Sequence, residues 1–204
     1  MEKFQNKYRV ASARLQNWDY GSNAVYFITI CTKNREHFFG EMDNKKMMLN
    51  SIGKLAEQFW IEIPKHFTFI EFGNFVVMPN HVHGILIIDK IGGEISEMVD
   101  TVDTVDTVET RQCLVSTNVP PNPNKPTIGQ KRFQNQGKNT ISSIVGSYKS
   151  VLTKNARLID VDFGWQSRFH DHIIRNDGEF QRISEYIINN PRNWQTDKFQ
   201  KKNR

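Results

Sequence analysis

The spacing of apolar positions along this chain changes several times, and each change marks a predicted element. Residues 24–32 (AVYFITICT) mix β-branched and aromatic side chains in a short run typical of a buried strand. A helical period follows, and Asp43 is a suitable N-cap for it. We therefore predict an amphipathic helix that ends at Pro64, with its apolar stripe at Met48, Ile52, Leu55, Phe59 and Ile63.

Two more strands are predicted at residues 67–78 and 81–89, separated only by the turn-forming pair Pro79-Asn80, which favours an antiparallel pair. A second helix begins after Thr140, and a third spans about 177–190, before Pro191. Helices alternating with an antiparallel strand pair indicate an α+β sandwich, in which a central antiparallel sheet has helices packed on one face.

The chain has 204 residues, of which 38% are hydrophobic, and this size predicts a single domain over 1–204. Residues 91–139 lack periodicity and contain the repeat VDTVDTVDTVET followed by VPPNPNKP, so we interpret them as a flexible insertion. A passive linker and an electrostatic lid over a basic face are both compatible with its composition. Residues 160–204 are predicted to form a C-terminal helical segment.

The charge distribution favours a polyanionic partner. The chain carries 27 basic and 22 acidic residues, and six of the acidic ones lie within 91–110, where no Lys or Arg occurs. The remainder is therefore strongly basic, which favours nucleic acid. The N-terminus lacks the apolar region of a signal peptide and no stretch is long and apolar enough for a membrane span, so we expect a cytoplasmic protein.

The sharpest local feature is His81-Val82-His83 at the start of an otherwise apolar strand. Side chains two residues apart on a strand share a face, about 7 Å apart at the Cα atoms, so the two imidazoles could share one divalent ion. Two hydrogen-bonded histidines at the end of a sheet would give the same pattern.

A second pair, His170-Asp171-His172, has the same spacing and lies between Arg168 and Arg175. Spacing alone does not choose between the two pairs. For the second pair we favour contact with phosphate or bases, and a solvated surface turn is the alternative.

Three blocks together resemble a known family: PNHVHGILII, the helix IVGSYKSVLTKNAR, and WQSRFHDHIIRNDGEFQRISEYIINNP. They are similar to the REP-associated tyrosine transposases, within the wider group of single-tyrosine transposases that carry a His-hydrophobic-His motif. The resemblance covers about residues 24–194, apart from the acidic insertion.

The resemblance implies a ferredoxin-like or RNA-recognition-like core with His81 and His83 on a central strand. It implies that they bind Mg²⁺ or Mn²⁺ and that a tyrosine on a following helix, here Tyr148, cleaves and rejoins single-stranded or hairpin DNA of palindromic repeats through a 5′-phosphotyrosine. It leaves open whether the chain works as a monomer or a homodimer.

Tyr148 is the nucleophile expected from this resemblance, although it also lies on the apolar stripe of its helix, where a core aromatic is the usual occupant. Tyr186 also lies on an apolar stripe, which favours packing for it. Relatives often place an amide one helical turn after the nucleophile, whereas this chain has Leu152 there, so the third protein ligand of the metal stays unassigned.

Basic residues near these motifs in sequence, interleaved with aromatics, suit single-stranded DNA, whose bases stack on aromatic faces while Lys and Arg hold the backbone. The alternative is that the aromatics belong to the core and the arginines to a solvated rim. The predicted DNA contacts are Arg35, Lys149, Lys154, Arg157, Trp165, Arg168, His170, His172 and Arg175.

Three functions fit the sequence. The first is the transposase-type DNA nickase and rejoiner. The second is a non-catalytic, domesticated hairpin-DNA-binding protein on the same fold. The third is a metal-dependent hydrolase that uses water in place of tyrosine and leaves no covalent protein-DNA product.

Overall fold

The computed structural model describes residues 3–4, 7–8, 18–90 and 137–200. The predicted insertion at 91–139 lies outside the described residues except for its last three. Two two-residue strands, β1 (Lys3–Phe4) and β2 (Lys7–Tyr8), pair with each other near the N-terminus. Among the described residues, none of the helices combines the length and the apolar character of a membrane-spanning segment.

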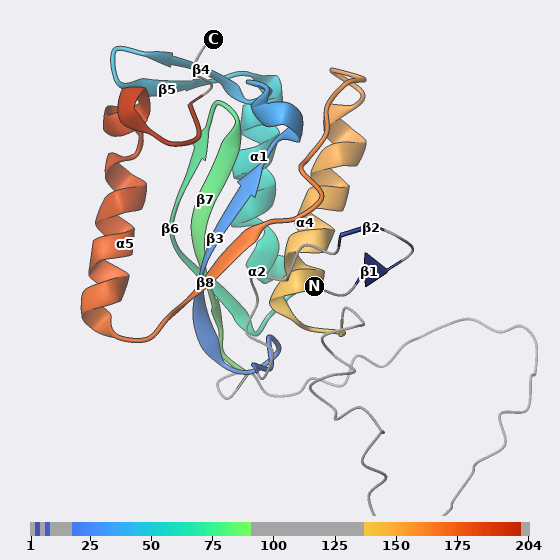
Figure 1. The fold of residues 1–204 in the computed structure, drawn as a ribbon, viewed down its shortest axis with the longest axis vertical. Helices are drawn as coiled ribbons and strands as arrows, with labels where there is room; N and C mark the ends of the chain where they lie inside the picture. Colours follow the sequence, from blue (N-terminus) through green and yellow to red (C-terminus); the bar gives the residue numbers. More distant parts are fainter. Residues whose placement is uncertain (1–2, 5–6, 9–17, 91–136, 201–204) are drawn as a thin grey trace, which may run out of the picture.

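The core of the fold is a four-stranded antiparallel sheet in the order β6-β7-β3-β8 (Figure 1). Its strands are β3 (Ala24–Cys31), β6 (Ile70–Met78), β7 (His81–Ile88) and β8 (His170–Ile174). Along the chain, α1 (Ser51–Ile61) and the short α2 (Ile63–His66) come between β3 and β6, and α4 (Ile141–Ala156) comes between β7 and β8. This strand order and the βαββαβ succession are those of a ferredoxin-like α+β fold, which confirms the predicted class.

Both faces of the sheet are covered, whereas the sequence predicted helices on one face. α1 and α4 pack on one face over the main core, which includes Val82 and Leu86 of β7. α5 (Asp177–Asn189) lies beside β6 in Figure 1 and packs on the other face, where Ile187 meets Ile85 of β7. The 3₁₀ helix η2 (Pro191–Thr196) continues from α5.

The first predicted helix begins later than the sequence pattern indicated. Residues 40–49 form a hairpin of β4 (Gly40–Asp43) and β5 (Lys46–Leu49) instead of helical turns. Its two turn residues, Asn44 and Lys45, have positive φ angles of 47° and 62°, as a tight hairpin turn requires. The N-cap is therefore Asn50, whose side chain accepts from Gly53 N, and not Asp43.

The fourth strand of the sheet was not predicted. The segment of His170 and His172 is the edge strand β8, paired with β3, and not a surface turn. The 3₁₀ turn η1 (Lys33–Arg35) follows β3 and brings Arg35 next to the C-terminal segment, where its guanidinium donates to Lys198 O at 2.9 Å.

Candidate metal and nucleophile site

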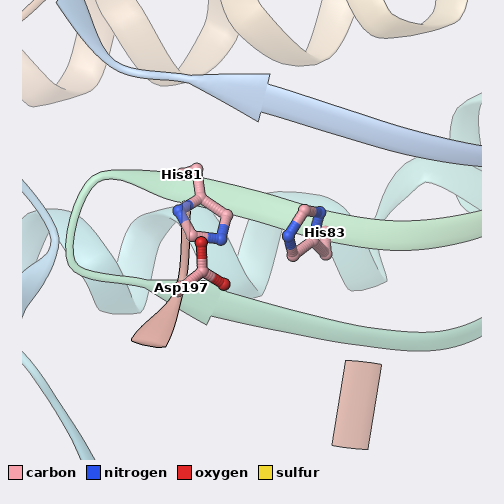
Figure 2. A group of neighbouring side chains, drawn as sticks. All are labelled: His81, His83 and Asp197. Carbon is pink, nitrogen blue, oxygen red and sulfur yellow. The ribbon is translucent and has the colours of Figure 1, made fainter. Parts of the chain in front are cut away.

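His81 and His83 project from β7 toward the α5 face of the sheet. Side chains alternate along a strand, so the histidines share the side of Ile85, which packs against α5, while Val82 points into the main core. Figure 2 shows both imidazoles on the same side of β7 with the Asp197 carboxylate beside them. The predicted shared face of the two histidines is therefore observed.

One potential ligand atom from each of these three residues lies within 4.8 Å of the others. The two imidazole centroids are 4.4 Å apart. Sequence reasoning missed Asp197, because it lies in the turn after η2, more than 100 residues from the histidines and outside any motif.

Each imidazole is held through its Nδ1 atom. His81 Nδ1 lies 2.8 Å from Asn80 Oδ1, and His83 Nδ1 lies 2.8 Å from Thr29 Oγ1 on the neighbouring strand. This leaves the two Nε2 atoms for the interior of the site. His81 Nε2 is buried, and none of the described residues offers it a hydrogen bond.

Burial keeps both histidines neutral. It lowers the pKa of His83 to about 3, with smaller effects from Lys198 and His170. It also lowers the pKa of His81 well below its usual value, assisted by His83, Arg35 and Lys198. Neutral imidazoles have the lone pairs that a metal ion needs.

Aromatic side chains cover the pair. His81 and His83 are 0% and 1% exposed. The centroid of the Phe199 ring lies 4.7 Å from that of His81 and 5.5 Å from that of His83, and Trp194 is stacked against His81. The cover is anchored by polar contacts, since Asn80 Nδ2 donates to Phe199 O and the backbone N–H of Phe199 donates to Asp197. The site is closed on this side in the structure.

Tyr186 is the tyrosine that meets the histidines. Its hydroxyl lies 3.3 Å from His83 Nε2, and the residue is 40% exposed. Burial and the nearby Asp197 charge raise its pKa, which a hydrogen bond with Asn190 opposes. The sequence pattern favoured packing for this residue. One signal could have corrected that interpretation: the family that the sequence resembles often places an amide one helical turn after the nucleophile, and Asn190 follows Tyr186 at that spacing.

Tyr148 lies on the opposite face of the sheet, which contradicts its predicted role as nucleophile. It is 3% exposed, packs edge-on against Trp60, and donates its hydroxyl to Ala56 O at 3.0 Å. Burial raises its pKa. Its position on the apolar stripe of α4 thus marks a core residue, and the sheet separates it from the histidines.

Asn190 and Asp197 form a polar pair beside the histidines. Asn190 Nδ2 donates to Asp197 Oδ2 at 3.0 Å, which fixes the orientation of the amide. Its Oδ1 is buried and has no hydrogen-bond partner in the part of the chain that the structure describes. Within the described residues, two buried polar atoms near Asp197, this oxygen and His81 Nε2, thus have no hydrogen-bond partner, which is rare in proteins.

Eight of the nine predicted DNA contacts fall into two groups, and the ninth, Arg35, lies against Lys198 and Phe199. His170 and His172 of β8 pair with Thr29 and Phe27 and share the α5 face with the metal candidates, and Arg168 and Arg175 flank that strand. The second group lies on or against α4, where the Lys149 ammonium donates to Gln166 O and stands over Trp165. This group comprises Lys149, Lys154, Arg157 and Trp165.

No protein-family model matches the chain. It is 36% identical over 191 residues to an uncharacterized protein of Haemophilus influenzae, covering 91% of this chain and 90% of that protein. Among solved structures, it is similar to a REP-associated tyrosine transposase bound to a REP hairpin, with 15% identity, a TM-score of 0.49, and 92% and 74% of the two chains covered. It is also similar to a proposed transposase from Deinococcus radiodurans, with 11% identity, a TM-score of 0.41, and 89% and 97% covered.

Proposed function

This chain belongs to the same family as the Haemophilus influenzae protein, and we propose that it cleaves and rejoins single-stranded or hairpin DNA, with Tyr186 as nucleophile and a divalent ion at His81 and His83. The observation that carries the proposal is the contact of the Tyr186 hydroxyl with His83 Nε2 on the face where both neutral imidazoles meet Asp197.

The ion would be held by His81 Nε2, His83 Nε2, an Asp197 oxygen and Asn190 Oδ1. The fit rests on the unpartnered buried acceptors of His81 and Asn190, which an ion would satisfy. Imidazole is a softer ligand than oxygen, so this mixed set suits Mn²⁺ better than Mg²⁺. A bound ion would polarise the scissile phosphate and stabilise the leaving oxygen.

Tyr186 and Asn190 reach the site from one turn of the α5 region, so the same element would orient the nucleophile and complete the ligand set. The raised pKa of Tyr186 keeps its hydroxyl protonated at neutral pH. In the reaction, the bond from the Tyr186 oxygen to phosphorus forms, the bond from phosphorus to the 3′ oxygen breaks, and the phenolic proton passes, in net terms, to that 3′ oxygen.

The product is a 5′-phosphotyrosine and a free 3′-OH. The covalent link is itself a phosphodiester, so a second 3′-OH can reverse the step and join a new strand without ATP. Tyr186 is 40% exposed, which leaves a route from solvent to its ring, whereas Phe199 covers the histidines. DNA entry therefore requires Phe199 to withdraw.

For the DNA path, we propose the α5 face and its β8 edge. Arg35, Arg168, His170, His172 and Arg175 would contact the strand that carries the scissile phosphate. Lys149, Lys154, Arg157 and Trp165 would contact a more distant part of the hairpin, because α4 covers the other face of the sheet.

The test is a covalent-adduct assay. Purified protein is incubated with Mn²⁺ and an end-labelled DNA hairpin with single-stranded flanks, and the products are separated on a denaturing gel. We expect an adduct with the wild type and with Tyr148→Phe, and none with Tyr186→Phe. Tyr148→Phe is the matched control, since it removes the same atom from the opposite face.

Each other result has a defined meaning. Loss of the adduct in Tyr148→Phe alone would return the nucleophile to that residue and refute the Tyr186 assignment. Cleavage without an adduct would indicate the hydrolase. Hairpin binding without cleavage would indicate the non-catalytic DNA-binding protein.

A further inference from the structure

Asn80, the turn residue before β7, is fully buried beside the site, and both polar atoms of its side chain and its backbone oxygen have hydrogen-bond partners. Its side-chain NH₂ group donates to Arg35 O at 3.2 Å and to Phe199 O at 2.9 Å. Its Oδ1 lies 2.8 Å from His81 Nδ1. Its own backbone oxygen accepts from the backbone N–H and the hydroxyl of Thr32.

These contacts leave one orientation for the amide. The two partners of Nδ2 are carbonyl oxygens, which only accept hydrogen bonds, so the nitrogen must face them. The exchanged orientation would set Oδ1 against two carbonyl oxygens in a buried place, at a cost of about 1–3 kcal/mol for each unsatisfied group. Oδ1 therefore faces His81.

The fixed amide determines where His81 carries its proton. An amide oxygen only accepts, so the contact at 2.8 Å is a hydrogen bond only if Nδ1 carries the hydrogen. A proton on Nε2 as well would be a buried donor without an acceptor, because this atom has no partner within the described residues. The stable form has Nδ1–H and a bare Nε2 lone pair directed into the site.

His83 lacks such a constraint. Its Nδ1 contacts the Thr29 hydroxyl, and its Nε2 contacts the Tyr186 hydroxyl. A hydroxyl both donates and accepts, so either tautomer of His83 can be accommodated. The two histidines thus differ in how firmly their ligand atom is prepared.

We propose that Asn80 is a positioning residue that locks His81 in the Nδ1–H tautomer and so presents Nε2 as a ready ligand atom for a divalent cation. This inference deepens the proposed function and rests on it only for the statement that the bound group is a divalent cation. Partners that orient a ligating histidine in this way raise metal affinity by about 10- to 100-fold.

The test reads the tautomer directly in the metal-free protein. Long-range ¹H–¹⁵N NMR spectra of the imidazoles distinguish a protonated from a bare ring nitrogen. We expect His81 to show a protonated Nδ1 and a bare Nε2 in the wild type, and a mixture of tautomers in Asn80→Ala. Asn80→Asp keeps an acceptor for Nδ1 and should restore the wild-type tautomer of His81, although it loses the two donors to Arg35 O and Phe199 O and should therefore lower the stability of the protein.

A metal titration follows on the same three proteins. Calorimetry with Mn²⁺ should show affinity about 10- to 100-fold weaker in Asn80→Ala and partly restored in Asn80→Asp. His83 should keep its wild-type spectrum in Asn80→Ala, which separates a local effect on His81 from general unfolding.

Two results would overturn the proposal: a wild-type His81 protonated at Nε2, or an Asn80→Ala protein that retains the pure Nδ1–H form. If Asn80→Ala does not fold, the wild-type and Asn80→Asp spectra decide alone. The tautomer is read without DNA or metal, so a protein that shows the lock but binds no Mn²⁺ and forms no adduct would refute the proposed function and leave this inference standing.

Discussion

At the scale of single residues, the chemistry of the site follows from which face of a strand each side chain occupies. His81 and His83 could be placed together from sequence because strand alternation is strictly local. Tyr186 could not, because helix spacing alone does not distinguish a tyrosine on an apolar stripe that ends beside two histidines from one that ends in a core. Tyr148 was expected as the nucleophile from the family resemblance, and its place on the apolar stripe of its helix was the signal that favoured a core residue.

Neutral buried histidines predict an acid-sensitive fold. In the folded protein the pKa of His83 is about 3 and that of His81 is also lowered, while both are near 6.5 in the unfolded chain. Between these limits the unfolded chain binds more protons than the folded protein, so the free energy of unfolding rises with pH. The contribution of the histidines to stability is therefore lost as the pH falls below about 6.5. The slope reaches about 1.4 kcal/mol per pH unit for each histidine.

Urea unfolding in EDTA at pH 4.5–7.5 measures this slope. His83→Asn should reduce it, and His66→Asn, at an exposed position, is the matched control. An equal slope in the wild type and in His83→Asn would contradict the assignment of a buried neutral imidazole.

At the scale of elements, the sequence predicted the helices and strands that have a regular apolar period, and it did not predict the short strands that lack one. β3, β6, β7 and the two helices α4 and α5 follow their sequence patterns closely. The β4-β5 hairpin was read as the start of a helix because Met48 happens to fall in phase with the stripe of α1. β8 was missed because a five-residue edge strand rich in polar residues has no clear alternation.

The packing of α1 on β7 depends on Gly84, between the histidine pair and the rest of the strand. A Cβ at Gly84 would lie 2.3 Å from Cζ2 of the buried Trp60. Gly84→Ala should therefore destabilise the protein by about 1–3 kcal/mol, since the indole has no space to withdraw. At Gly178, in the first turn of α5, a Cβ meets only Asn176 at 3.5 Å.

Urea unfolding of Gly84→Ala and Gly178→Ala provides the comparison. Gly178→Ala should match or slightly exceed the wild type, because alanine has the better helix propensity. Equal stability of the two variants would show that α1 does not press on β7 as described.

At the scale of the whole molecule, the ferredoxin-like sheet separates the main hydrophobic core from the candidate site. The α1 and α4 face carries the main core, and the α5 face carries the candidate site under a cover formed by the C-terminal segment. The fold class was predictable from the order of the elements. The cover was not, because it depends on contacts of Phe199 with Asn80 and Arg35, which are far apart in sequence.

Phe199→Ala should open the site. Half-burial of a phenylalanine side chain contributes about 1.4 kcal/mol, so its removal should speed access to the histidines by about tenfold. Carbethoxylation of His81 and His83 by diethyl pyrocarbonate, followed by mass spectrometry, measures access without requiring catalysis. Gln200→Ala is the control, and an unchanged rate in Phe199→Ala would refute the covering role.

The central claim is that His81 and His83 hold one divalent ion together on the α5 face. Anomalous diffraction from crystals soaked in MnCl₂ tests it most directly. We predict a Mn²⁺ peak within bonding distance of His81 Nε2, His83 Nε2 and the Asp197 carboxylate, absent in His81→Ala/His83→Ala. A fully occupied Mn²⁺ elsewhere, with both imidazoles metal-free, would contradict the account.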